Sequence, residues 1–129
     1  MSPELDVLII GAGVAGLYQL YKIRNMGLRV KCLETAPKIG GTWYWNRYPG
    51  ARFDSESWTY GYSFSRELLE EWDWTEDFAA QPETEKYLNF VADKFDLKSS
   101  IDFETKVLSA KFDDTHDFWV IETENGKTY

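Results

Sequence analysis

The sequence predicts an α/β fold in which helices wind around a parallel sheet, and three observations carry this prediction. Residues 5–10 read as a buried strand that ends in the apolar run VLII, residues 11–16 form a glycine-rich turn, and residues 29–34 read as a second strand that ends in an acidic side chain, Glu34. This order of strand, turn, helix and strand is typical of the Rossmann-like, doubly wound architecture.

The glycine-rich turn, GAGVAG, has the spacing of a dinucleotide-binding site. Gly11 allows a tight turn out of the strand, Gly13 allows backbone N–H groups to approach a pyrophosphate, and Gly16 allows the helix to pack closely on the strand. The following helix N-terminus favours a phosphate through its dipole and unpaired N–H groups, and Ala15 lies in that first turn. We therefore expect these four residues to bind the cofactor.

Glu34 ends the second strand, where a carboxylate can accept hydrogen bonds from an adenosine ribose. A carboxylate at this position disfavours a 2′-phosphate, so the site is expected to hold FAD or NAD rather than NADP. The alternative is a strand-helix-strand unit that binds no nucleotide.

The segment after the turn is predicted to be a helix over residues 14–26, ended by Gly27, because apolar side chains recur at helical spacing. Residues 35–62 contain proline, glycine and many aromatic side chains without a clear period. We expect an ordered loop there, with one helical turn near Ser57.

Two more helices are predicted after this loop. Ser65 can cap a short helix over residues 65–71, and a longer helix has Pro82 in its first turn. The longer helix carries one apolar stripe that is expected in the core, formed by Tyr87, Leu88, Val91 and Phe95.

The last third of the chain is predicted to contain β segments at residues 101–104, 106–112 and 118–123. Asn125-Gly126 is typical of a two-residue hairpin turn, so residues from Lys127 onward should pair back on 118–123. These segments would form a hairpin or β-meander inserted after the parallel strands.

The first strand, residues 5–10, is normally central in a doubly wound sheet, with neighbours on both sides. Only three residues follow the predicted hairpin turn. The sequence therefore predicts a sheet truncated at its C-terminal end, whose apolar edge would be covered by a missing segment or by another chain.

Composition narrows the class of protein further. The 129 residues suffice for one modest domain, and the net charge of −8 argues against nucleic acid or an anionic membrane as a partner. No signal peptide or membrane span is recognisable, and we expect a cytoplasmic protein with a buried, inert thiol at Cys32. No metal-binding residues are identified.

The segment GGTWYWNRYPGARFD, residues 40–54, is more specific than the glycine-rich turn. Gly40 and Gly41 permit close backbone approach to a second part of the same cofactor, Thr42 can hydrogen-bond a phosphate, and large rings can shield an isoalloxazine from water. The alternative is an aromatic cluster that only packs.

Together with GAGVAG, Glu34, YSFS and the stretch EEWDWTEDFAAQPETEKYLNFVADKFDL, this segment closely resembles the flavin-dependent Baeyer–Villiger monooxygenases, especially the phenylacetone and cyclohexanone type. The resemblance extends over essentially the whole chain and corresponds to the N-terminal part of longer enzymes. It implies that residues 1–129 are a partial FAD-binding domain and that the NADPH-binding domain is absent from this chain. It also implies an NADPH-dependent reaction that inserts an oxygen atom from O2 next to the carbonyl of a small-molecule ketone, giving an ester or lactone.

The resemblance also implies roles for individual residues. The three glycines of the turn would face the pyrophosphate, and Glu34 the ribose. The pyrophosphate-to-flavin portion would be wrapped by Thr42, Trp43, Tyr44 and Trp45. Asp54 and Tyr60 would lie near the flavin, and Val107 would touch adenine through its backbone, although plain core packing of Val107 is the open alternative.

Three neighbouring residues would form the nicotinamide-side pocket for NADP, namely Arg52, Phe53 and Asp54. Asp54 is also the catalytic assignment, because in the family its carboxylate orients an arginine that would lie beyond residue 129. No second GxGxxG occurs, and the sole histidine, His116, lies in a predicted turn. The isolated chain is therefore not expected to oxidise ketones.

Two other functions remain open from the sequence. One is a related flavin monooxygenase that oxygenates nitrogen or sulfur. The other is a non-enzymatic module that binds nucleotide weakly, or not at all, and assembles with a second polypeptide through its open sheet edge.

Overall fold

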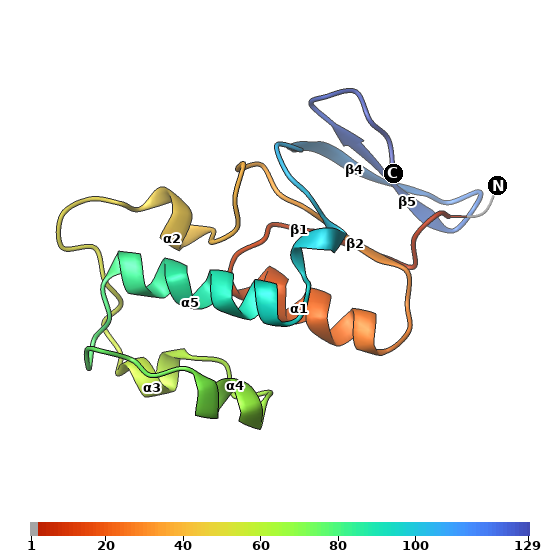
Figure 1. Cartoon of the computed structure of the whole chain (residues 1–129). Helices are drawn as coiled ribbons and strands as arrows, with labels where there is room; N and C mark the ends of the chain where they lie inside the picture. Colours follow the sequence, from red (N-terminus) through yellow and green to blue (C-terminus); the bar gives the residue numbers. More distant parts are fainter. Residues whose placement is uncertain (1–2) are drawn as a thin grey trace.

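The computed structural model describes residues 3–129 and is built on a parallel sheet with strand order β1-β2-β3 (Figure 1). The strands are β1 (Val7–Ile10), β2 (Val30–Leu33) and β3 (Ile101–Asp102). In the register of the sheet, Ile9 pairs with Cys32, and Cys32 pairs with Ile101. The predicted α/β class with a parallel sheet is confirmed.

The third strand is shorter than the predicted segment 101–104, which is a correction. Glu104 has a positive φ of 50°, and the N–H of Thr105 donates to the carbonyl of Glu34 at 2.9 Å. The chain therefore turns away from β2 after Asp102, at the level where β2 ends.

The two long helices, α1 (Val14–Asn25) and α5 (Gln81–Lys94), are drawn below the strands in Figure 1. The guanidinium of Arg24 near the end of α1 donates to the carbonyls of Phe95 and Asp96. The ring of Tyr21 meets that of Phe95 at 4.8 Å between centroids. These contacts join the C-terminal ends of the two helices, with Arg24 bonding the carbonyls of the two residues that follow α5.

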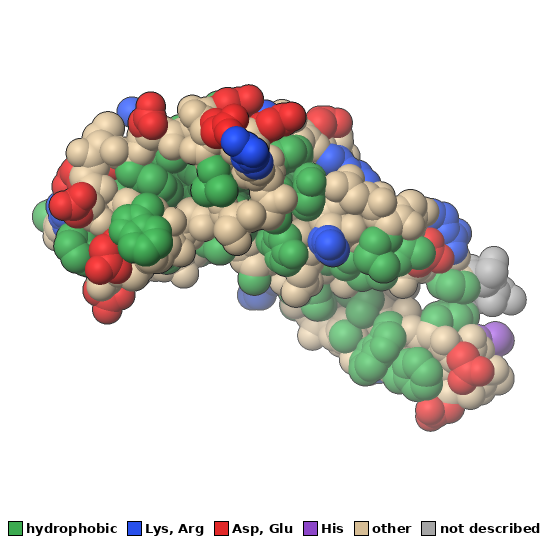
Figure 2. Space-filling view, turned by 90° about the horizontal axis from the view of Figure 1, so that it is seen from below, with side chains coloured by type: hydrophobic (Ala, Val, Ile, Leu, Met, Phe, Trp, Pro, Cys, Tyr) green, Lys and Arg blue, Asp and Glu red, His purple; other side chains and the backbone are tan. Residues whose placement is uncertain are grey.

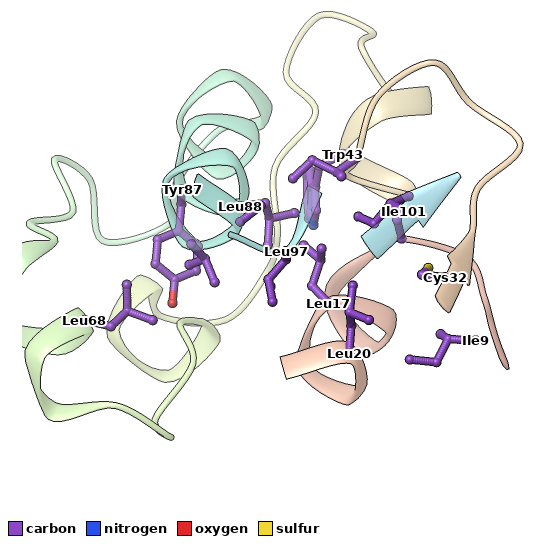
Figure 3. Packing of buried hydrophobic residues seen from close by; sticks show 14 of the residues in the cluster. Ile9, Leu17, Leu20, Cys32, Trp43, Leu68, Tyr87, Leu88, Leu97 and Ile101 are labelled. Atoms are coloured by element: carbon purple, nitrogen blue, oxygen red, sulfur yellow. The ribbon is translucent and has the colours of Figure 1, made fainter. Parts of the chain in front are cut away.

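The apolar stripe predicted for α5 does face the core. Tyr87, Leu88 and Val91 are buried, and Phe95 is partly buried against the same cluster. Pro82 lies in the first turn, and Lys94 lies in the last turn, where a positive charge opposes the helix dipole favourably. Figure 3 shows the cluster between the helices and the sheet, with Leu17 and Leu20 of α1 facing Leu97, Ile101, Cys32 and Ile9.

The segment predicted as a loop over residues 35–62 contains two helical turns, α2 (Thr42–Trp45) and α3 (Ser57–Tyr60). The turn near Ser57 was predicted, but α2 was not. The N–H groups of Trp43 and Tyr44 bond the carbonyls of Gly40 and Gly41 at 3.0 Å, so α2 begins on two glycines with positive φ.

A third short helix, α4 (Arg66–Glu71), follows, and the hydroxyl of Ser65 accepts the N–H of Leu68 at 3.2 Å, as a cap should. A 3-10 turn, η1 (Lys98–Ser100), then leads from α5 into β3.

The predicted hairpin is confirmed as an antiparallel pair, β4 (Val107–Asp113) and β5 (Phe118–Thr123). After Asn125-Gly126 the chain pairs back on β5, because Ile121 and Tyr129 exchange backbone hydrogen bonds of 2.8 and 2.9 Å. The turn is not the predicted two-residue type, because the N–H of Thr123 donates to the carbonyl of Lys127 at 3.1 Å, which leaves residues 124–126 in the turn. The hydroxyl of Tyr129 donates to the carboxylate of Asp102 at 2.6 Å. This bond fixes the returning strand against β3.

Strand β1 pairs only with β2 among the strands that the structure describes in residues 3–129. Ile10, its last residue, is 61% exposed. What covers this edge stays a prediction.

Candidate nucleotide-binding site

The glycine-rich turn lies where β1 meets α1. Gly11 has a φ of +98°, which favours glycine, and its N–H donates to the carbonyl of Leu33 at 2.8 Å. Gly13 is the N-cap of α1, without a side-chain cap and without an acidic residue in the first turn. The N–H of Leu17 donates to the carbonyl of Gly13. The N–H groups of the residues just before Leu17, in the first turn of α1, are therefore available to an anion.

Gly16 is required by packing. A Cβ atom there would lie 1.8 Å from the carbonyl oxygen of Gly11, and this oxygen belongs to backbone that cannot rotate away. The helix therefore lies directly on the turn, and the absence of a side chain at residue 16 sets the position of the helix N-terminus.

Gly40 and Gly41, just before α2, lie against the glycine-rich turn. A Cβ atom on Gly41 would lie 3.0 Å from the Cα of Gly13, and one on Gly13 would lie 3.5 Å from the Cα of Gly41. The N–H of Gly40 donates to the carbonyl of Ala12 at 3.0 Å. The backbone of the loop before α2 thus packs directly on the backbone of the glycine-rich turn before α1, and together they form one wall of the candidate site.

Glu34 is 5% exposed, and both of its carboxylate oxygens accept backbone N–H groups. One bond comes from Ala12 at 2.6 Å and the other from Ala36 at 2.8 Å. The acid predicted to face a ribose therefore also fixes the glycine-rich turn to the end of β2. Each carboxylate oxygen has a further lone pair, so a ligand hydroxyl can still donate to it.

The start of the hairpin lies close to this acid. Thr105 donates its N–H to the carbonyl of Glu34 at 2.9 Å, and Val107, two residues on, begins β4. Val107 is only partly buried and pairs with Thr123. The fold thus brings three parts of the chain that are far apart in the sequence to one end of the parallel strands: the glycine-rich turn, Glu34 and Val107.

In the segment 35–62, some aromatic residues are buried and others are exposed. The indole N–H of Trp43 donates to the hydroxyl of Tyr60 at 2.7 Å, and Phe53 stacks on Tyr60 at 4.1 Å between centroids. Trp43 and Phe53 are each 6% exposed, and their rings pack on one another edge to face at 5.8 Å between centroids. Thr42 and Trp45 are exposed, and Tyr44 is half-buried.

Arg52 and Asp54 flank the buried Phe53 and are both exposed. Arg52 donates to the carbonyl of Phe78 at 2.9 Å and to the carboxylate of Glu76 at 3.2 Å. Of the three residues predicted for a nicotinamide-side pocket, only these two present side chains to solvent.

The sequence did not point to the contributions of Ala12 and Ala36, and it pointed to Gly40 only as one of two consecutive glycines. Each acts through its backbone N–H or carbonyl. Nothing in the two alanine side chains signals such a role, whereas the doubled glycine at 40 and 41 was a usable signal.

No helix within residues 3–129 combines the length and apolar character needed to cross a membrane. Over the same range, the structure contains no group of three or more His, Cys, Asp or Glu side chains arranged to hold a metal ion.

The fold and this arrangement of loops define a dinucleotide-binding domain of the Rossmann type. Residues 9–70 match the family described as NAD(P)-binding Rossmann-like domain.

Along nearly its whole length, the chain is similar to flavin-dependent monooxygenases of the Baeyer–Villiger type, which confirms the resemblance predicted from the sequence. It is 49% identical over 127 residues to acetone monooxygenase (methyl acetate-forming) of Gordonia sp. (strain TY-5), covering 98% of this chain and 24% of that protein. It is 46% identical over 127 residues to phenazine N-monooxygenase PhzNO1 of Lysobacter antibioticus, with coverage of 98% and 24%. The structure of OTEMO in complex with FAD and NADP superposes with a TM-score of 0.94 at 42% identity, covering 99% of this chain and 24% of that one.

The chain therefore spans about a quarter of the length of the curated relatives it matches.

Proposed function

We propose that this chain is the FAD-binding part of an NADPH-dependent Baeyer–Villiger monooxygenase, which inserts an oxygen atom from O2 next to a ketone carbonyl to give an ester or lactone. The observation that carries the proposal is the apposition of Gly13 and Gly41 beside the carboxylate of Glu34. Similarity to an acetone monooxygenase that forms methyl acetate, and to a structure with FAD and NADP, supports it.

The residues present fit a dinucleotide. The uncapped N-terminus of α1 and the side-chain-free positions Gly11 and Gly13 suit a pyrophosphate, with Ala15 and Gly16 in the same turn. Glu34 suits an adenosine ribose, and Val107 would lie on the adenine side. Bound FAD would supply the redox chemistry, taking electrons from NADPH and activating O2.

The second loop would hold the pyrophosphate-to-flavin portion. Gly41, Thr42, Tyr44 and Trp45 are available for contact, whereas Trp43, Phe53 and Tyr60 would act by packing under the loop and excluding water from it. Arg52 and Asp54 would face NADP. As the catalytic assignment, Asp54 would orient an arginine that lies outside this chain.

The protein would work in the cytoplasm on a small ketone. Residues 1–129 would form part of an FAD-binding domain, and further polypeptide would cover the free edge of β1 and supply the NADPH-binding domain. The chain alone would bind flavin without oxidising ketones.

A flavin titration of the 129-residue chain tests the proposal. Saturable binding, followed by flavin fluorescence quenching and the visible spectrum, is expected for the parent. Gly13→Asp should abolish it by placing a carboxylate where a phosphate belongs, while the far-ultraviolet circular dichroism stays unchanged. Equal flavin binding by parent and variant would overturn the assignment of the site.

A related enzyme that oxygenates nitrogen is the second candidate, because phenazine N-monooxygenase is nearly as similar as the acetone enzyme. Oxygenation of a phenazine but of no ketone by the complete protein would favour it. A folded chain that binds no FAD yet associates with a second polypeptide would favour a purely structural module.

A further inference from the structure

A hollow of about 340 Å³ lies among α3, α4 and the segment that joins α4 to α5. None of the glycines of the nucleotide site, nor Glu34, lines it. A volume of this size is at the lower end of those that enclose small molecules. The hollow is therefore separate from the glycine-rich turn and from Glu34.

Aromatic rings form much of its wall. The lining includes Trp58, Trp72, Trp74 and Tyr87. Tyr87 anchors the two neighbouring tryptophans, with ring centroids 4.7 Å from Trp74 and 5.3 Å from Trp72. Trp58 is 75% exposed, so its ring adds a solvent-facing side to the wall. Leu68 and Leu69 complete the apolar part of the lining.

The charged groups of the lining are all acidic, namely Asp73, Glu76 and Asp77. Glu76 is paired with Arg52 at 3.2 Å, whereas the carboxylates of Asp73 and Asp77 form no ion pair within the described part of the chain, residues 3–129. Residues 54–77 contain eight acidic side chains against one basic side chain, Arg66. Figure 2 shows acidic and hydrophobic side chains interleaved over this part of the molecule.

Aromatic faces and carboxylates together suit one kind of ligand. The negative face of an indole or phenol ring attracts a cation, most strongly when the cation holds its water weakly, as a quaternary ammonium group does. Unpaired carboxylates add attraction at longer range, and apolar walls accept the methyl groups of such a cation. An anion would meet repulsion, and a neutral molecule would gain only from the apolar walls.

We propose that this hollow binds a small organic cation of the quaternary ammonium class. The site goes beyond the proposed monooxygenase function and shares no residue with the cofactor site. Trp58 provides the ring that covers the cation, and Asp73 and Asp77 provide the compensating charge.

Calorimetric titration of the 129-residue chain with choline tests the proposal, with 3,3-dimethylbutan-1-ol as a probe of the same shape without the charge. Choline should bind saturably and at least about fivefold more tightly than the neutral probe. Added salt should weaken choline binding. Flavin is left out of both titrations, so that the result does not depend on the cofactor site.

Trp58→Ala should weaken choline binding about three- to tenfold. Trp119→Ala is the matched control, because Trp119 is an exposed tryptophan on β5, 60% exposed, away from the hollow. It should bind choline like the parent. Asp77→Asn should weaken choline but not the neutral probe.

Three results would overturn the proposal: no saturable binding of choline, equal affinity for both probes, or equal effects of Trp58→Ala and Trp119→Ala. Because Trp58 is exposed, its replacement should leave the circular dichroism unchanged. A variant that unfolds would be replaced by Trp58→Leu, which keeps an apolar side chain without the ring and should weaken choline binding to the same extent.

Discussion

Gly41 touches Gly13 backbone to backbone: a Cβ atom on Gly41 would lie 3.0 Å from the Cα of Gly13. The two glycines lie in different loops, one before α2 and one before α1. The shape of the nucleotide site therefore depends on both loops, and substitutions at the two positions should have different effects.

Gly41→Ala should lower the free energy of unfolding by about 1 to 3 kcal/mol, because φ of +53° with ψ of −117° is strained for an alanine. The close approach to Gly13 adds to this cost. Urea unfolding measures the loss. Gly50→Ala is the control, since Gly50 also has a positive φ but has no atom within 4 Å of an added Cβ. A Gly41→Ala variant as stable as the parent would contradict the observed contact.

Gly13→Ala should leave the free energy of unfolding within about 0.5 kcal/mol of the parent, since φ of −86° suits alanine and its Cβ would be in ordinary contact, 3.5 Å from Gly41. Its methyl group would nevertheless occupy the surface on which we propose that a pyrophosphate lies. FAD affinity, measured by fluorescence titration, should therefore fall without loss of stability. Unchanged affinity would place the phosphate elsewhere.

Glu34→Ala should destabilise the chain as well as weaken FAD, because it leaves the N–H groups of Ala12 and Ala36 without acceptors. Each buried N–H left unpaired costs about 1 to 3 kcal/mol. Urea unfolding without cofactor measures this part separately. Glu122→Ala is the control, since Glu122 is exposed. Full stability of Glu34→Ala would mean that its carboxylate does not hold the turn.

Cys32 should be unreactive in the folded chain. Burial, reinforced by the nearby charge of Glu34, raises the pKa of its thiol from 9.0 to about 12. This pKa is higher in the folded than in the unfolded state. The contribution of Cys32 to the free energy of unfolding is therefore fully present below pH 9.0 and is lost as the pH rises towards 12.

Labelling with Ellman's reagent at pH 8 should be slow for the native chain and rapid in urea. Rapid labelling of the native chain would show that β2 is accessible to solvent.

Trp72→Phe and Trp43→Phe should lower the free energy of unfolding by different amounts. The indole nitrogen of Trp72 is the only buried side-chain nitrogen or oxygen without a hydrogen-bond partner in residues 3–129, whereas that of Trp43 donates to Tyr60. The second variant loses a hydrogen bond and the first does not. Urea unfolding should find Trp43→Phe less stable than Trp72→Phe by about 1 kcal/mol. The reverse order would contradict the assigned bonding.

The sequence predicted those elements whose causes are local. The apolar strand before Gly11, the stripe on α5 and the turn at Asn125-Gly126 all follow from residue spacing, and each is present. The first turn of α1 could likewise be predicted as an anion site, because a helix N-terminus without a capping side chain leaves N–H groups free.

The remaining features depend on contacts between distant residues. Helix α2 forms in TWYW, a sequence with little helix propensity, because Gly40 and Gly41 dock on the first loop. The sequence predicted that the carboxylate of Glu34 faces a ribose, but not that it also accepts a backbone N–H. The donor, Ala12, is brought to Glu34 by the pairing of the parallel strands. The stacking of Phe53 on Tyr60, seven residues later in the same loop, could not be predicted from residue spacing, and the place of Phe53 in a cofactor pocket stays a prediction.

The glycine-rich turn has one more consequence, for the order in which the chain acquires its structure. Gly11 bonds the carbonyl of Leu33, and Ala12 bonds Glu34 and Gly40, all of them at least 22 positions later in the chain. The turn therefore acquires its shape only when β1 and β2 have paired. Exchange of the Ala12 amide hydrogen with solvent should then need the same cooperative opening that separates these strands, so that this amide is among the most slowly exchanging in the molecule.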